Sequence, residues 1–295
     1  MTDRPDPDFA RQVWLRIETV HAVTYFDPAP VEAGRALGSA GFWQTYFGMR
    51  AAPLGSVGPT MVDASFANFA PSFVRRWVPG AWVVAEPPAW VAARSASAVE
   101  ALTRIDDADV RRATSVNELL EAVSSAADPC GRVLFAANQD LELPDEPVAR
   151  LWQVCTNLRE HRGDGHVAAY VAEGLCGLDA HVLLAASGAG TTAVDLQRGA
   201  RGWTVDDWER ASSALSERGL LETRPAGEIL TEAGRSVRDR IELATDRAAS
   251  APWAAVPARA GQRVLAELTP LAAAIAGSGV IRFPNPISLP PLAPT

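Results

Sequence analysis

The segment LREHRGDGHVAA, at positions 158–169, gathers ionisable side chains between an apolar run and a run of small residues. Arg159 and Arg162 are suited to hold a carboxylate, sulfate or phosphate, because a guanidinium can donate two parallel hydrogen bonds to such a group. The segment therefore predicts substrate-binding roles for these two arginines.

Proton-transfer residues lie in the same segment. His161 and His166 titrate near neutral pH, and Asp164 can orient or charge one of them, so these three residues are the predicted acid–base groups. Gly163 and Gly165 argue against one regular helix. We expect a glycine-rich turn that opens a second helix at Gly165 and presents free backbone N–H groups to an anion.

The same residues permit two other interpretations, a structural salt-bridge network and a metal site. Arginines and acids at a junction of helices often form a salt-bridge network that only ties the helices together. His161, Asp164, His166 and His181 could ligate a metal ion, but the sequence has neither HExxH nor CxxC spacing. We predict no metal site.

The first half of the chain offers partners for this site. His21 and Tyr25 end a predicted helix at 8–25, and Arg50 follows an aromatic cluster. Arg50 and Asn68 are hard to place in a core, because a buried guanidinium or amide needs a hydrogen-bonding partner. We therefore expect a cleft between the two halves of the chain. Its predicted lining is His21, Tyr25, Arg50, Asn68, Arg159 and His166. His21 is the fourth predicted catalytic residue, and Tyr25, Arg50 and Asn68 are predicted to bind the substrate.

Composition limits the class of protein. The net charge is −8, and all basic residues are arginine, which suggests a GC-rich coding genome. Bulk negative charge repels nucleic acids unless a local basic face overcomes it. The motifs GxxxxGK[ST] and GxSxG are absent, no GxGxxG follows a strand, and no lysine exists to form a Schiff base, so we predict no cofactor. Three cysteines without CxxC spacing, and the lack of an apolar signal segment, indicate a soluble cytoplasmic protein that does not enter a membrane.

Hydrophobic periodicity predicts a mainly α-helical fold in two halves. The expected domains are an N-terminal helical domain (1–128), a connector (129–147), a winged-helix-like domain (148–280) and an extended C-terminal tail (281–295). In the tail, FPNPI is predicted to dock on the body and LPPLAPT to be free.

The second half has the sequence order of a winged helix-turn-helix, and the first half is a candidate for the same fold. A helix at 205–218 leads through RGLLE to a polar hairpin, LTEAG and a long helix at 231–249. The predicted recognition helix at 205–218 begins with Asp206, Asp207 and Glu209. Residues 201–247 hold eight arginines against ten acids. Since DNA-reading modules are usually basic, DNA binding is not favoured.

Several motifs together resemble a known family. They are GFWQTYFGMRAAPLG, SFANFAP, LREHRGDGHVAA, DAHVLLAA, ERGLLE followed by LTEAG, and FPNPI. In these the chain, from about residue 9 to 290, resembles an actinobacterial family of helix-turn-helix proteins of unassigned function. The resemblance implies a helical fold with winged-helix-like modules, and a fold does not determine a function.

Three functions follow from these patterns. The preferred one is a cofactor-free acid–base enzyme, such as a lyase or cyclase of specialised metabolism, acting on a small anionic organic molecule. The second is a ligand-responsive winged-helix transcription regulator. The third is a non-catalytic scaffold or homodimer, with the helices at 231–249 and 258–277 as its seam.

Overall fold

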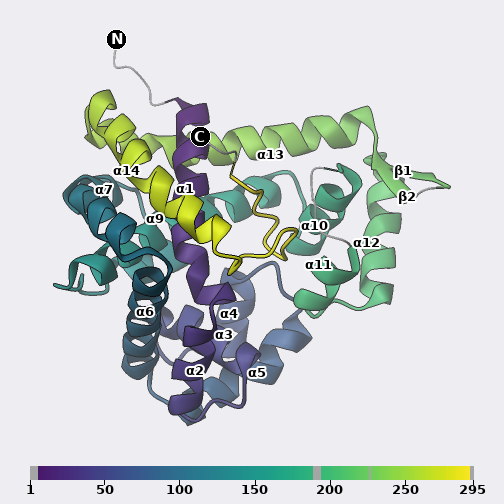
Figure 1. The fold of residues 1–295 in the computed structure, drawn as a ribbon. Coiled ribbons are helices and arrows are strands. Elements are labelled where there is room, and N and C mark those ends of the chain that lie inside the picture. Colours follow the sequence, from purple (N-terminus) through teal and green to yellow (C-terminus); the bar gives the residue numbers. More distant parts are fainter. Residues whose placement is uncertain (1–5, 189–193, 226, 293–295) are drawn as a thin grey trace.

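The computed structural model describes residues 6–188, 194–225 and 227–292, and within these ranges the chain is helical apart from one two-stranded sheet (Figure 1). Proline opens many of the helices, because its missing N–H would be unpaired in a first turn in any case. The first half contains α1 (Pro7–Phe26), α2 (Pro28–Ala36), α3 (Phe42–Ala51), α4 (Pro59–Ser65), α5 (Pro71–Val84), α6 (Pro87–Ala113), α7 (Asn117–Ser125) and α8 (Val133–Gln139).

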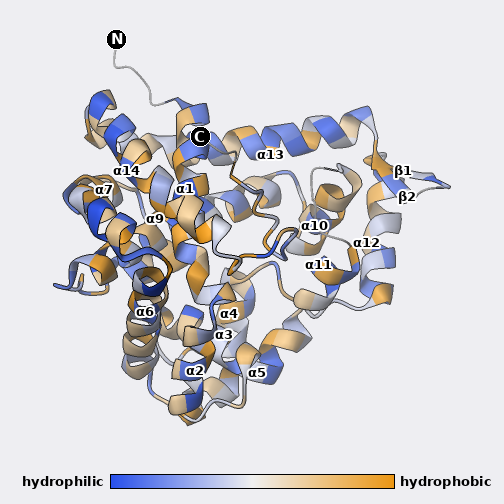
Figure 2. Cartoon of the chain, viewed as in Figure 1, coloured by the Kyte–Doolittle hydropathy of each residue, from blue (hydrophilic) through white to orange (hydrophobic). Residues whose placement is uncertain are grey.

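The second half continues with α9 (Pro147–Ala172), α10 (Gly177–Ala186), α11 (Val194–Ala200), α12 (Val205–Glu217), β1 (Leu221–Arg224), β2 (Gly227–Leu230), α13 (Glu232–Ser250) and α14 (Ala258–Gly277). Figure 2 shows hydrophilic and hydrophobic residues alternating along α13, as expected for a helix with one face on the core and the other in water.

Helix α9 corrects the prediction of a break at Gly163 and Gly165. It is one continuous helix, so no helix begins at Gly165 and no anion-binding N-terminus exists there. Each glycine costs a helix interior about 1 kcal/mol relative to alanine. Packing of α9 against α1, α6, α8 and α13 outweighs this cost. A Cβ on Gly165 would lie 3.7 Å from the Cβ of Ala248 on α13, which is an ordinary contact distance.

One hydrophobic core joins the two halves of the chain. Val13 of α1, Leu102 of α6, Trp152 of α9 and Leu268 of α14 are all buried in it. The segment 129–147, predicted as a connector, contains α8, which packs against α9. The apolar face of α14, one side of the predicted dimer seam, packs within the chain against α1 and α6 (Figure 1).

The winged helix-turn-helix-like module is confirmed at one side of the molecule, where α10, α11 and α12 precede the β1–β2 hairpin (Figure 1). Thr204 and Asp207 form a capping box that begins α12, each side chain accepting from the other's backbone N–H. The antiparallel hairpin pairs Leu221 with Leu230, and both pack with Trp208 in a separate small core. Within the described ranges the first half of the chain contains no strand.

The C-terminal segment, drawn in yellow, lies across the body after α14 (Figure 1). The Asn285 side chain donates to the carbonyl of Leu289 and accepts from its N–H, which folds the segment back on itself. Leu289 is buried in the main core. The prediction of a free tail from Leu289 onward is therefore wrong at Leu289, whereas Pro290 and Pro291 are exposed and 293–295 lie outside the described residues. FPNPI docks on the body as predicted.

Candidate functional site

A cavity of about 540 Å³ lies where α1, α3, α9, α10, α13 and the C-terminal segment meet. Its volume is in the range of small-molecule sites. Seven of the nine predicted site residues line it, and they come from both halves of the chain. They are Tyr25, Arg50, Asn68, Arg159, Arg162, Asp164 and His166. His21 and His161 are not part of this lining.

Helix α9 supplies the longest stretch of the cavity wall. Successive residues of an α-helix are rotated by about 100°, so Arg159, Gly163 and His166 share one face. Gly163 lies in the middle of that face and has no side chain, so the helix backbone itself forms the cavity wall there. A Cβ on Gly163 would have only Glu160 Oε2, at 3.7 Å, and a terminal nitrogen of Arg159, at 4.0 Å, close to it.

Two of the predicted anion-binding arginines are already in ion pairs. Arg50 donates from Nε and Nη2 to the two oxygens of Glu160, both at 3.2 Å. Arg159 lies 2.9 Å from Glu160 and 3.0 Å from Glu18. Burial alone would raise the pKa of Glu160, but the charges of Arg159 and Arg50 outweigh it and hold this pKa well below its usual range. This is the salt-bridge network that the sequence offered as an alternative.

Arg162 belongs to a second network, which ties α1, α9 and α13 together. Its Nη2 donates to Asp246 at 2.9 Å, and its guanidinium lies 4.0 Å from the centre of the Trp14 ring. Arg11 reaches Asp246 at 2.7 Å and Glu242 at 2.6 Å. Arg162 is thus neutralised by protein carboxylates.

Asp164 and His166 are the acid–base candidates in the cavity wall. Asp164 Oδ2 accepts from the N–H of Phe135 at 2.9 Å, and burial, assisted by the charge of Glu160, raises the pKa of Asp164 to about 7. Burial lowers the pKa of His166 to about 4. At neutral pH Asp164 therefore holds a proton part of the time, while His166 is uncharged.

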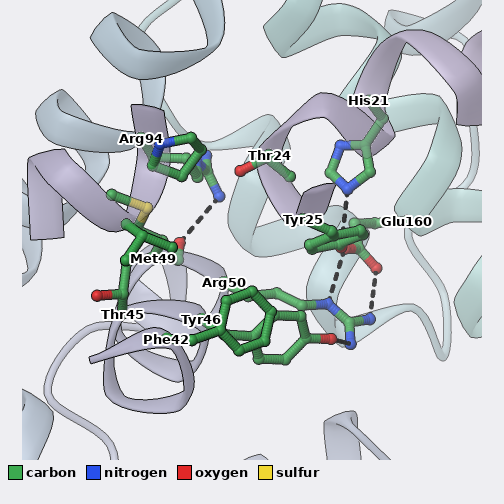
Figure 3. Close-up of a pocket in the computed structure, with 12 residues that line it drawn as sticks. His21, Thr24, Tyr25, Phe42, Thr45, Tyr46, Met49, Arg50, Arg94 and Glu160 are labelled. Atoms are coloured by element: carbon green, nitrogen blue, oxygen red, sulfur yellow. Dashed lines mark hydrogen bonds and ion pairs between the residues drawn. The ribbon is translucent and has the colours of Figure 1, made fainter. Parts of the chain in front are cut away.

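His21 is hydrogen-bonded to Tyr25, and both line a small cavity of about 20 Å³ (Figure 3). Its Nδ1 is 3.0 Å from the hydroxyl of Thr156, which itself donates to the carbonyl of Trp152. Thr156 therefore accepts from His21 Nδ1–H, and Tyr25 donates its hydroxyl proton to His21 Nε2 at 2.8 Å. Burial lowers the pKa of His21 well below its usual value. Both ring nitrogens are engaged, so the predicted catalytic role of His21 could act on the large cavity only through Tyr25.

The amino-acid sequence of this chain matches a protein-family model over most of its length. The sequence model described as Helix-turn-helix family matches residues 10–282. The chain belongs to this helix-turn-helix family. No curated protein and no solved structure matched the chain.

The remaining predicted residues of this helix-turn-helix family member have structural partners. His161 packs against the Phe135 ring, 5.0 Å between centres, away from the cavity, so its predicted catalytic role lacks access. Asn68 lines the cavity, and its backbone carbonyl accepts a hydrogen bond from Nε1 of Trp203. No cluster of three or more histidine, cysteine or acidic side chains in the described ranges is placed to hold a metal ion.

The lining also includes residues that were not predicted as site residues, among them Arg201 and His181. The motif DAHVLLAA contains His181, but nothing near either residue in the sequence indicates a cavity, because the other lining residues come from distant segments. In the part of the chain that the structure describes, no single helix is long and apolar enough to cross a membrane. The pair α9 and α10 reaches that length and composition together, with a bend of 89° between them.

Proposed function

We propose that this protein binds a small organic anion in the large cavity and carries out a cofactor-free acid–base reaction on it, such as an elimination or a cyclisation. The observation that carries the proposal is the placement of Asp164 and His166 in the wall of one cavity. Around the axis of a regular helix, Asp164 is rotated from Gly163 by about 100° in one direction and His166 by about 60° in the other. A ligand lying over Gly163 would have one group on each side.

The proposed chemistry is a paired proton transfer. Neutral His166 takes a proton from a C–H or O–H group of the ligand, and the electron pair of that bond forms a new bond within the ligand. Protonated Asp164 donates its proton to the leaving group as it departs. Exchange with water returns both side chains to their starting states. Each proton transfer of this kind contributes roughly 10²–10⁴-fold in rate.

The test is an incubation at pH 7 with a pooled, desalted library of organic acids, sulfonates and phosphate esters and their neutral analogues, followed by mass spectrometry. We expect one anion to disappear and a product of equal mass, or of a mass lowered by the leaving group, to appear without an added cofactor. Asp164→Asn and His166→Gln should each slow this conversion by about 10²-fold or more.

The control for these variants is Asp239→Asn, since Asp239 is exposed on α13. It should convert the anion as fast as the wild type. If the wild type neither binds nor converts any anion in preference to its neutral analogue, the proposed function is wrong. If an anion binds but Asp164→Asn and His166→Gln change nothing, the protein is a binder and the proposed reaction is wrong.

A ligand-responsive regulator is the second candidate, favoured by the winged module and its family. Helices α10 and α13 of that region border the cavity, so a bound ligand would contact the module directly. The charges argue against it. Arg210 is paired with Asp207 on α12, Arg224 with Glu222 on the wing, and Arg240 with Glu173. A carboxylate beside each of these arginines offsets its charge, so the three pairs add no net positive charge to attract phosphates.

Fluorescence anisotropy with pooled genomic DNA fragments distinguishes the two candidates. We expect no binding even at low salt. Micromolar or tighter binding that weakens steeply with salt would support the regulator instead.

A further inference from the structure

Arg201 is a buried cation with no carboxylate partner among the residues that the structure describes. Its side chain follows α11 and lines the cavity, and the residue is only 8% exposed. Five other arginines line the cavity, and each is in an ion pair with a carboxylate, whereas Arg201 has none among the described residues. Burial is costly for such a charge unless something pairs with it.

The hydrogen bonds of Arg201 are also incomplete. Its Nη2 donates to the carbonyl of Pro286 at 3.0 Å, and its guanidinium lies 5.0 Å from the centre of the Phe69 ring. Its Nε is buried and has no hydrogen-bond partner within the described ranges. A buried donor without an acceptor is unusual in a folded protein, and this one belongs to a side chain that lines a cavity, where a ligand can bring an acceptor.

His181 has the same property on the neighbouring helix α10. It lines the cavity, and its Nε2 is buried without a partner in the part of the chain described. Burial, followed by the nearby charge of Arg201, lowers the pKa of His181, so the ring is neutral at pH 7. A neutral imidazole with Nε2–H can donate to an oxygen that also accepts from Arg201.

We propose that Arg201 and His181 form an oxyanion subsite, which holds the carboxylate of the cavity's ligand. This inference rests on the proposed function, because it assigns one end of the ligand bound there. It moves anion binding from Arg159 and Arg162, which protein carboxylates already neutralise, to the guanidinium that lacks a counter-ion. A monoanion is the matching head group, because Arg201 contributes one uncompensated positive charge.

The rest of the ligand is apolar. The apolar part of the cavity lining includes Leu183 and Leu184 of α10, Ile241 of α13 and Ile287 of the C-terminal segment. A carboxylate bearing an aromatic or aliphatic body would place its charge on Arg201 and its body against these side chains. The ligand class is therefore an amphipathic organic monocarboxylate.

The test is isothermal titration calorimetry with three probes that share one body: 2-naphthoate, 2-naphthamide and 2-naphthyl phosphate. We expect naphthoate to bind most tightly, and Arg201→Gln to weaken it at least tenfold, which is about the effect of losing a hydrogen bond to a charged group. His181→Phe should weaken it in the same direction. Binding of the amide should not respond to Arg201→Gln.

Two variants and a melting measurement control this experiment. Arg224→Gln makes the same chemical change on the exposed wing and should leave binding unchanged. Gly163→Leu projects a branched side chain into the cavity at the position assigned to the ligand, and it should abolish binding of all probes. Arg201→Gln should also melt no lower than the wild type, because it removes an uncompensated buried charge, whereas a structural role for Arg201 would lower the melting temperature.

The outcomes separate the subsite from the proposed function. If Gly163→Leu abolishes naphthoate binding but Arg201→Gln does not weaken it, the cavity is the site and the subsite is wrong. If the phosphate binds more tightly than the carboxylate, the assigned head group is wrong. If no probe binds the wild type, the assigned ligand class is wrong. If binding survives Gly163→Leu, the cavity is not the ligand site and the proposed function itself fails.

Discussion

Nδ1 of His166 and the hydroxyl oxygen of Thr245 lie 3.0 Å apart, across the contact between α9 and α13. The Thr245 hydroxyl donates its own proton to the carbonyl of Ile241 at 2.7 Å, so toward His166 it can only accept. The proton of the neutral imidazole is therefore on Nδ1, and Nε2 keeps a lone pair. A contact between two helices thus sets which nitrogen of His166 can act as a base.

Thr245→Val should remove the hydrogen bond that holds His166 in the Nδ1–H tautomer. Without an acceptor for Nδ1–H, we expect ¹⁵N NMR of His166 to change from one tautomer to a mixture, and the free energy of unfolding to fall by about 1 kcal/mol. Thr19→Val is the control, since Thr19 is equally buried and bonds only within α1. An unchanged His166 spectrum in Thr245→Val would show that Thr245 does not fix the tautomer.

Gly163→Ala should stabilise the protein. The new Cβ would meet Glu160 and Arg159 only at ordinary contact distances. Alanine should therefore add about 0.5–1 kcal/mol to the free energy of unfolding, measured in urea. Gly165→Ala is a matched control, because its nearest neighbour, Ala248, also lies at 3.7 Å. Stabilisation by Gly165→Ala alone would mean that the Gly163 site is more crowded than its contacts indicate.

The two glycines also show where sequence reasoning failed. Local signals located the helix at 258–277 and the winged hairpin, because each depends on residues close in sequence. A break at Gly163 and Gly165 was equally reasonable from local propensity. Whether two glycines end a helix depends on what packs against it, and α1, α6, α8 and α13 come from elsewhere in the chain.

The site was predicted as far as residue type allowed. Arg50 and Asn68 stood out because a buried guanidinium or amide needs a partner, and the structure brings both, together with Tyr25, to the same cavity as Arg159. The sequence could not tell which arginines are neutralised. Arg201 differs from Arg159 only through the absence of a carboxylate partner among the described residues, which is a long-range property.

Asp164→Asn should change how stability depends on pH. Burial raises the pKa of Asp164 to about 7, from an ordinary value of 3.8. A raised pKa in the folded state contributes stability that is fully present below about pH 4 and is lost as pH rises through about 7. The wild type should therefore lose roughly 2–4 kcal/mol relative to Asp164→Asn between pH 4 and pH 7.

Urea unfolding at pH 4.5, 6 and 7.5 measures this difference. The exposed Asp239→Asn should show none of it. If the difference between wild type and Asp164→Asn is the same at all three pH values, Asp164 is ionised in the folded protein, and it cannot be the proton donor of the proposed reaction.

Glu160→Gln should be the most destabilising of these changes. It leaves Arg50 without its carboxylate partner in a buried site and weakens the network of Arg159, and breaking a buried ion pair costs about 3–5 kcal/mol. Glu222→Gln removes an exposed pair on the wing and should cost at most about 1 kcal/mol in the same urea titration. If Glu160→Gln costs no more than Glu222→Gln, Arg50 and Arg159 do not depend on Glu160 for neutralisation. They would then be available to a ligand anion, and Arg201 would no longer be distinguished from them.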